Sequence, residues 1–241
     1  MTRGDPPIGL DLGRLKRAQE LLSRRVRFEP LPEDPFPLAG VDVSYLEAGG
    51  AELALCAAVV VDAGMRVLEV RACAGRVRFP YVPGFLAFRE VGLAFSCVRA
   101  LSVGPRALLV DGAGVAHPRR AGFASHLGLL LDLPSVGVAK SRLVGRHHPV
   151  PRTRGSWVPL WLDEEVVGAV LRTRDEVRPL YVSVGHRATL RSALDLVLRC
   201  TGPFRVPEPL RVAHLLSERL KGEVLRGVEG LRPAEGFLVV K

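Results

Sequence analysis

The chain of 241 residues is poor in aromatic residues and in cysteine. Aromatic residues make up 6% of it, and its four cysteines lie far apart, with no Cys-x-x-Cys pair and no histidine close by. This spacing argues against a structural zinc site and is typical of reduced core cysteines in a cytosolic protein. The four are Cys56, Cys73, Cys97 and Cys200.

Hydrophobic segments long enough to cross a membrane are also absent. The longest apolar run, residues 53–61, has about half the length of a membrane-spanning helix. The first ten residues contain Arg3, Asp5 and two prolines, which is unlike the apolar centre of a signal peptide. With 48% hydrophobic residues, the chain can still form a globular core. We therefore expect a cytoplasmic globular protein without membrane contact.

Lysine is nearly missing, so arginine supplies almost all of the positive charge. Lys+Arg 34 against Asp+Glu 25 gives a net charge of +9 and a pI near 10.1. Guanidinium groups form planar, bidentate contacts with phosphate, which favours a polyanionic partner such as nucleic acid. A GC-rich coding bias would produce the same replacement of lysine by arginine, and it stays open as an alternative. The four lysines are Lys16, Lys140, Lys221 and Lys241.

The first part of the chain predicts one helix followed by three antiparallel strands. Residues 1–9 resemble a loose tail, and apolar residues then recur at helical spacing over residues 12–26. A proline-rich connector leads to strand-like stretches that are separated by glycine turns, which predicts a meander. These stretches cover residues 38–46, 53–62 and 66–76.

Helical and strand-like segments alternate in the remainder. Helices are expected over residues 85–101, 119–131, 189–200 and 210–221, and strands over 106–110, 134–139, 166–171 and 181–184. This order predicts one α/β domain over residues 1–241, with a mixed sheet in which an antiparallel meander is followed by parallel strands. Residues 146–159 are expected to form a loop, and residues 222–241 are an extension without an assignment.

Three carboxylates stand in apolar surroundings. Asp42 lies within the first expected strand, Asp111 ends a buried strand, and Glu90 borders the apolar stripe of a helix. A buried carboxylate is costly unless it is hydrogen-bonded or binds a cation. If the three meet, their repulsion is usually relieved by a divalent ion, and oxygen ligands favour Mg²⁺ or Mn²⁺.

Each acid also has a structural interpretation, as a turn former, a surface charge or a satisfied polar residue. The order of elements, however, can set the first strand beside the fourth. Asp42 and Asp111 would then converge, with Glu90 arriving from the helix between them. Metals bound by carboxylates serve the attack of water on a phosphodiester.

Four segments resemble, in order, the sequence signatures of the endonuclease V (deoxyinosine 3′-endonuclease) family. They are GVDVS at 40–44, RFPYVPGFLAFRE at 78–90, VDGAGVAHPRRAGFASHLG at 110–128 and PSVGVAKSRL at 134–143. The resemblance implies a ribonuclease H-like fold. It also implies Mg²⁺-dependent hydrolysis, with Mn²⁺ as a substitute, of the second phosphodiester bond 3′ to a hypoxanthine, which initiates DNA repair. The partner would be deoxyinosine-containing DNA, with inosine-containing RNA as a second candidate, and a monomer is expected.

By position, the resemblance implies that Asp42, Glu90 and Asp111 bind the metal. It implies that Lys140 holds the scissile phosphate or the attacking water, and that His214 is a fourth metal-proximal residue. His117 is expected at the start of a helix, facing the scissile phosphate. A solvated lysine and two structural histidines are the alternatives for these three residues, and His126 is expected to pack.

Other positions would contact the lesion and the backbone. A wedge of Tyr81, Val82, Pro83 and Gly84 would enter the duplex where the base leaves the stack, although an ordinary loop tyrosine is the alternative. The pocket for the flipped base would be lined by Gly112, Gly114, Gly122, Gly137, Ala139 and Leu143. Phosphates would be contacted by Arg89, Arg119, Arg120, Arg142, Arg146, Arg152 and Arg154.

Two departures from the family pattern concern the pocket rim, because Ala113 and Ala116 are smaller than the residues expected there. Two rival functions remain, another ribonuclease H-like nuclease and a nucleic-acid-binding protein without catalysis. The intact acid triad argues against the second, because a pure binder has no use for buried carboxylates that oppose phosphate.

Overall fold

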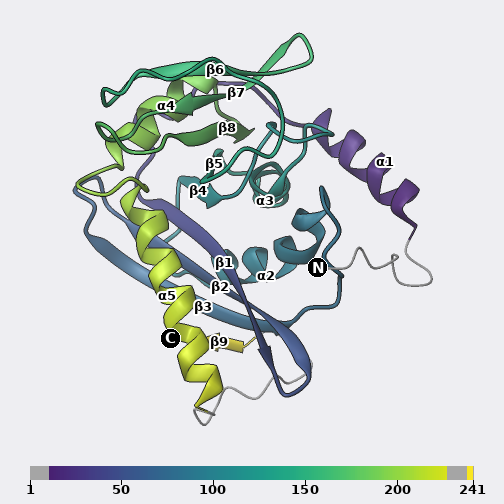
Figure 1. The fold of residues 1–241 in the computed structure, drawn as a ribbon. Helices are drawn as coiled ribbons and strands as arrows, with labels where there is room; N and C mark the ends of the chain where they lie inside the picture. The colour runs from purple at the N-terminus through teal and green to yellow at the C-terminus, as the bar shows by residue number, and fades with distance from the viewer. Residues whose placement is uncertain (1–10, 227–237, 241) are drawn as a thin grey trace.

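Within the residues that the structure describes, one sheet of nine strands organises the protein, in the order β6-β7-β8-β5-β4-β1-β2-β3-β9 (Figure 1). The structure, a computed structural model, describes residues 11–226 and 238–240. The tail expected at residues 1–9 therefore lies outside the described residues, as does most of the C-terminal extension. Within the described ranges, no helix is long and apolar enough to span a membrane.

The predicted meander is confirmed. Strands β1 (Leu38–Ala48), β2 (Ala51–Val61) and β3 (Val67–Arg76) pair antiparallel in sequence order. Gly49 and Gly50 turn β1 into β2 with φ of +57° and +73°, a conformation that suits residues without a Cβ. In the unassigned extension, β9 (Leu238–Val240) adds to the free edge of β3.

The first strand does lie beside the fourth. Strand β4 (Ala107–Asp111) runs parallel to β1 on one side and parallel to β5 (Ser135–Ala139) on the other. The β1–β4 ladder ends with Val41 opposite Val110. Asp42 and Asp111 are the next residues of these two strands, so the strand register itself brings both acids to one point of the sheet.

The other half of the sheet is antiparallel, so the expectation of parallel strands holds only for β4 and β5. Strands β6 (Trp157–Leu162), β7 (Glu165–Leu171) and β8 (Leu180–His186) pair antiparallel, and β8 also pairs antiparallel with β5. A two-residue turn joins β6 to β7, and such a turn permits no parallel pairing. The first three residues of β6 fall within the loop expected at residues 146–159. The strand contains Pro159, which an edge strand tolerates.

Helices cover both faces of the sheet (Figure 1). Helices α2 (Leu86–Arg99) and α3 (Phe123–Leu131) pack on one face. Helices α4 (Leu190–Arg199) and α5 (Glu208–Leu225) pack on the other. Helix α1 (Leu12–Ser23) stands at the margin of the molecule, beside α3.

The helix expected from residue 119 begins only at Phe123. Arg120 adopts a left-handed conformation with φ of +55°, and Gly122 is the N-cap. Residues 117–122 therefore form a turn, which removes His117 from the helix start assumed for it.

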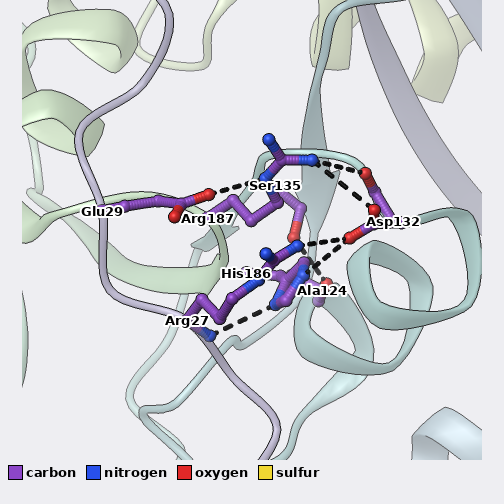
Figure 2. A network of polar contacts seen from close by, with 7 residues as sticks. All are labelled: Arg27, Glu29, Ala124, Asp132, Ser135, His186 and Arg187. Atoms are coloured by element: carbon purple, nitrogen blue, oxygen red, sulfur yellow. Dashed lines mark hydrogen bonds and ion pairs between the residues drawn. The ribbon is translucent and has the colours of Figure 1, made fainter.

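A polar network fixes the segment between α1 and β1 (Figure 2). The buried His186 accepts the Arg27 backbone N–H at Nδ1, and its Nε2 lies 3.3 Å from Asp132. Arg187 bridges Glu29 at 2.6 Å and the same Asp132, which ends α3 in the left-handed conformation. The network attaches α1 and its connector to α3 and β8, so α1 has a defined position.

Gly40 of β1 allows α5 to approach the sheet. An added Cβ would lie 2.4 Å from the Pro209 carbonyl carbon. We predict that Gly40→Ala lowers the free energy of unfolding by about 1–3 kcal/mol through overpacking. Gly92→Ala, in open space on α2, should instead raise it by about 0.5–1 kcal/mol. Urea unfolding measures both, and equal midpoints for the Gly40 variant and the wild type would contradict the close contact.

Candidate active site

Asp42 is held by helix α5. Its carboxylate is buried, accepts a hydrogen bond from Ser217 Oγ at 2.9 Å, and lies 3.1 Å from His214 Nδ1. His214 and Ser217 are three residues apart and therefore share one face of the helix. The structure thus brings His214 to the acids as expected, and it adds Ser217, which is fully buried.

Asp111 faces Asp42 from β4. Burial and the neighbouring Asp42 carboxylate raise the pKa of Asp111, and Lys140, whose Nζ lies 2.6 Å from Asp111 Oδ2, opposes the shift. The Lys140 side chain remains 41% exposed. Lys140 therefore lies at the site, as expected, with a charge that can reach both the acids and a ligand in solvent.

Glu90 approaches the two aspartates from α2. Its side chain is buried and accepts a hydrogen bond from Tyr45 Oη at 2.8 Å. Burial raises the pKa of Glu90 to about 8, the Tyr45 hydrogen bond opposes the rise, and the charges of Asp42 and Asp111 add to it. Burial, followed by the Glu90 charge, raises the pKa of Tyr45 well above its ordinary value.

Burial and the neighbouring acids raise the pKa values of Glu90 and Asp111, but the three acids are not arranged as a complete metal site. Within residues 11–226 and 238–240, no three His, Cys, Asp or Glu side chains stand in a ready arrangement for a metal ion. Asp111 is turned to Lys140 and Glu90 to Tyr45. The donor set still fits a hard divalent cation, because such an ion would offset the repulsion that raises the pKa of Glu90 and Asp111.

A second feature is the loop of residues 78–85 that leads into α2, named here the Tyr81 loop. Tyr81 itself is 70% exposed. Gly84 has φ of +78°, and its carbonyl accepts hydrogen bonds from Gln19, His117 and Arg119. Three side chains therefore fix the backbone at Gly84, near the end of the loop that carries the exposed Tyr81 ring.

His117 is one of these three supports. It is buried, and its Nδ1 accepts the Arg119 backbone N–H, so Nε2 carries the proton and donates to the Gly84 carbonyl at 3.0 Å. Burial lowers the pKa of His117 to about 4, so the ring is neutral. The geometry gives His117 a structural contact at the base of the Tyr81 loop, and its role at the scissile phosphate stays a prediction. His126 packs edge-on against Phe88, as expected.

Most of the arginines expected at phosphates are engaged within the protein. Arg89 pairs with Glu52 and lies over the Tyr45 ring, Arg120 pairs with Glu165, and Arg154 donates to the carbonyls of Thr173, Leu198 and Thr201. Arg152 forms an exposed pair with Glu176. Arg142 and Arg146 are exposed, and the described part of the chain offers neither an ion-pair partner. These contacts do not support phosphate roles for Arg89, Arg119 or Arg154.

Three of the four glycines expected to line the base pocket pack against protein backbone, and the fourth, Gly112, packs against the Phe123 side chain. A Cβ would lie 1.9 Å from the Val184 oxygen at Gly114, 2.3 Å from the Ala113 oxygen at Gly122, and 2.5 Å from the Gly114 nitrogen at Gly137. The N–H groups of Gly112, Gly114 and Gly122 donate within the protein. These glycines therefore anchor the loop after β4 to β5 and β8. Among the residues expected to line the base pocket, Leu143 is the one that faces solvent, with 53% of it exposed.

The two alanines of the expected rim differ in position. Ala116 is buried in a small apolar cluster with Leu160, Val167 and Val170, so it does not line a rim. Ala113 is half-buried, and its carbonyl accepts the Ala124 N–H at the start of α3. The small side chain at position 116 is thus explained by packing.

Sequence reasoning missed Tyr45, Ser217 and Gln19. Gln19 and Ser217 each carry a signal, since Gln19 interrupts the apolar stripe of α1 and Ser217 follows His214 at helical spacing. Tyr45 carries none, because a strand tyrosine is ordinary.

The raised pKa of Glu90 predicts a pH-dependent stability in the absence of divalent cations. A folded pKa of about 8, against 4.5 without the protein environment, means that the folded state binds the proton more tightly. The free energy of unfolding therefore falls as the pH rises from about 4.5 to 8. In EDTA at pH 9, Glu90→Gln should be more stable than the wild type by about 1–3 kcal/mol, with a smaller difference at pH 5. Denaturant titrations at both pH values measure this difference, the exposed Glu164→Gln is the control, and a pH-independent difference would contradict the assignment.

The chain is similar to known proteins over most of its length. The family model for endonuclease V matches residues 20–215. The endonuclease V of Roseiflexus castenholzii is 45% identical over 221 residues, which cover 89% of this chain and 96% of that protein. The endonuclease V of Nostoc punctiforme is 46% identical over 200 residues, which cover 83% and 90%.

Solved structures show the same fold. The crystal structure of endonuclease V from Streptomyces avermitilis superposes with a TM-score of 0.84 at 40% identity, covering 91% of this chain and 98% of that one. Endonuclease V from Ciona intestinalis, in complex with a DNA containing an inosine, superposes with a TM-score of 0.77 at 27% identity, covering 88% and 98%. This chain belongs to the endonuclease V family of nucleases.

Proposed function

We propose that the protein is a divalent-metal-dependent endonuclease that recognises hypoxanthine in nucleic acid and hydrolyses the second phosphodiester bond 3′ to it. The observation that carries the proposal is the convergence of Asp42 and Asp111, which directly follow the last residue pair of the β1–β4 ladder, with Glu90 of α2. The substrate class is supported by the related Ciona protein, whose crystal contains inosine-bearing DNA.

Asp42, Glu90 and Asp111 would hold Mg²⁺, for which Mn²⁺ can substitute. A bound divalent ion supplies charge for the phosphate and a lower pKa for the attacking water. Ser217 and His214 orient Asp42, and Tyr45 orients Glu90, so the ligand oxygens are held before any cation arrives. Lys140 can move from Asp111 to a phosphate oxygen. Water adds to phosphorus and the 3′ oxygen leaves with a proton, giving 3′-hydroxyl and 5′-phosphate ends.

Lesion recognition is assigned to the Tyr81 loop. Flipping a base costs a few kcal/mol, and an aromatic ring that fills the vacated stack offsets part of this cost. Tyr81 would enter the duplex with Val82, Pro83 and Gly84 behind it. The flipped base would lie against the loop after β4, with Ala139 and Leu143 at its side.

The remaining contacts are electrostatic. The net charge of +9 favours a polyanion, and Arg142 and Arg146 are exposed toward solvent. We assign the protein to the initiation of DNA repair in the cytoplasm, as a monomer, with inosine-containing RNA as the second substrate.

End-labelled duplexes test the proposal directly. Duplexes with and without one deoxyinosine, and a matched inosine-containing RNA, are incubated with Mg²⁺ or with EDTA. A Mg²⁺-dependent nick one nucleotide beyond the lesion is expected. Binding to the lesion without a nick in any reaction would overturn the catalytic assignment.

Substituting either aspartate should separate binding from cleavage. Asp42→Asn or Asp111→Asn should lower the single-turnover nicking rate by roughly a thousandfold or more, since metal-assisted charge stabilisation contributes several kcal/mol. Lesion binding should change little. Mg²⁺ should raise the melting temperature of the wild type more than that of either variant. The exposed Asp195→Asn is the matched control, and full activity in the Asp42 and Asp111 variants would exclude the metal assignment.

Removing the Tyr81 ring should affect selection more than chemistry. Tyr81→Ala should reduce the preference for deoxyinosine over an undamaged duplex by about tenfold to a hundredfold, since unstacking a base costs a few kcal/mol. Competition between the two duplexes in one reaction measures the preference. Trp157→Ala, an exposed aromatic on the edge strand β6, should leave it unchanged. An equal loss of rate on both duplexes would argue against a wedge.

A further inference from the structure

A fully buried amide lies beneath the Tyr81 loop. Gln19, the only glutamine in the sequence, has no solvent exposure, although it belongs to a helix at the margin of the molecule (Figure 1). Its Nε2 donates to the Gly84 carbonyl at 3.1 Å and lies 3.4 Å from the Ala121 carbonyl. Its Oε1 accepts a hydrogen bond from Arg119 Nε. Both ends of the amide are therefore in use.

The Gly84 carbonyl oxygen is a meeting point of several donors. Besides Gln19, it accepts hydrogen bonds from His117 Nε2 at 3.0 Å and from Arg119 Nη2. The Nε of the same guanidinium donates to Gln19 Oε1. The Arg119 guanidinium also lies 4.4 Å from the centre of the Phe85 ring. A carbonyl oxygen has two lone pairs, and here three donors surround it. The backbone at Gly84 is therefore restrained from several directions.

Packing alone does not require an amide at this position. Leu15 and Leu22 flank Gln19 on the same stripe of α1, and leucine would continue that stripe. A buried amide costs free energy unless it is hydrogen-bonded, so the hydrogen-bond partners of Gln19 indicate its role. Those groups are the base of the Tyr81 loop and the arginine that supports it.

We propose that Gln19 is a positioning residue for lesion selection. It connects α1 to the Gly84 carbonyl and orients Arg119, and so holds the Tyr81 loop, with its exposed ring, in place before DNA binds. The inference rests on the proposed function, because it concerns how the wedge of that function is prepared. A loop fixed in advance loses less conformational entropy when its ring enters the duplex, which favours the flipped state over non-specific binding.

Gln19→Met tests this role, because it keeps the length of the side chain and removes both hydrogen-bonding ends. We expect the preference for deoxyinosine over undamaged duplex to fall about tenfold, the effect of one or two buried hydrogen bonds. Binding to undamaged duplex should stay unchanged. In EDTA, the fluorescence increase of a 2-aminopurine beside the lesion, which reports base unstacking, should shrink. Leu22→Met, on the same helix stripe, is the matched control and should behave as the wild type.

A double-mutant cycle separates positioning from general stability. If Gln19 acts through the wedge, Gln19→Met in the Tyr81→Ala background should cost less than about twofold further preference, because coupled residues are not additive. Losses that multiply, or wild-type preference in the single variant, would overturn the proposal. Should Gln19→Met fail to fold, Gln19→Glu keeps the shape, cannot donate to Gly84 when ionised, and is expected to show the same loss.

The outcomes also distinguish this inference from the proposed function. If the wild type does not nick the deoxyinosine duplex, the proposed function fails. If the wild type nicks it and the Gln19 variants retain its preference and its 2-aminopurine signal, only the role of Gln19 fails.

Discussion

The repulsion among three buried carboxylates is the constraint on which the rest of this structure depends. Asp42 and Asp111 follow the last residue pair of the ladder between the parallel strands β1 and β4, and Glu90 approaches from the helix between those strands in sequence. Because burial and mutual charge raise the pKa of Glu90 and Asp111, this arrangement is unfavourable for folding at neutral pH in the absence of a cation. The acids must therefore be stabilised by neighbouring side chains, which here are Tyr45, Ser217, His214 and Lys140.

These supporting residues explain the architecture around the site. Helix α5 packs close to β1 because Gly40 leaves room for Pro209, and that packing brings the Ser217 and His214 face to Asp42. Tyr45 lies on the other side of the same strand, where it meets Glu90. One strand therefore serves both helical layers, with its alternating side chains directed to different partners.

Arginine has a different use here from the one that its abundance indicates. Arg89, Arg119 and Arg154 extend into the protein, where their donors satisfy backbone carbonyls, acids and aromatic rings. A guanidinium group suits these roles because it presents several donors in one plane and packs over a ring. Net charge therefore indicated the class of partner, while the individual contacts depend on what each arginine meets after folding.

The sequence by itself determined the order of elements, the meander and the three acids, because each is a local pattern of periodicity, glycine turns or polar residues in apolar surroundings. The Tyr81 turn was singled out by the resemblance to a known family and not by a local pattern. It did not determine the turn at residues 117–122, the strand β6 that contains Pro159, or the antiparallel half of the sheet, since these depend on neighbours distant in sequence. The partners of the site were decided in the same way. Gln19 meets Gly84, and Ser217 meets Asp42, across 65 and 175 residues of chain. Only the tertiary structure could decide such contacts, because a hydrogen bond between distant segments exists only after packing has brought its donor and acceptor together and excluded water from both.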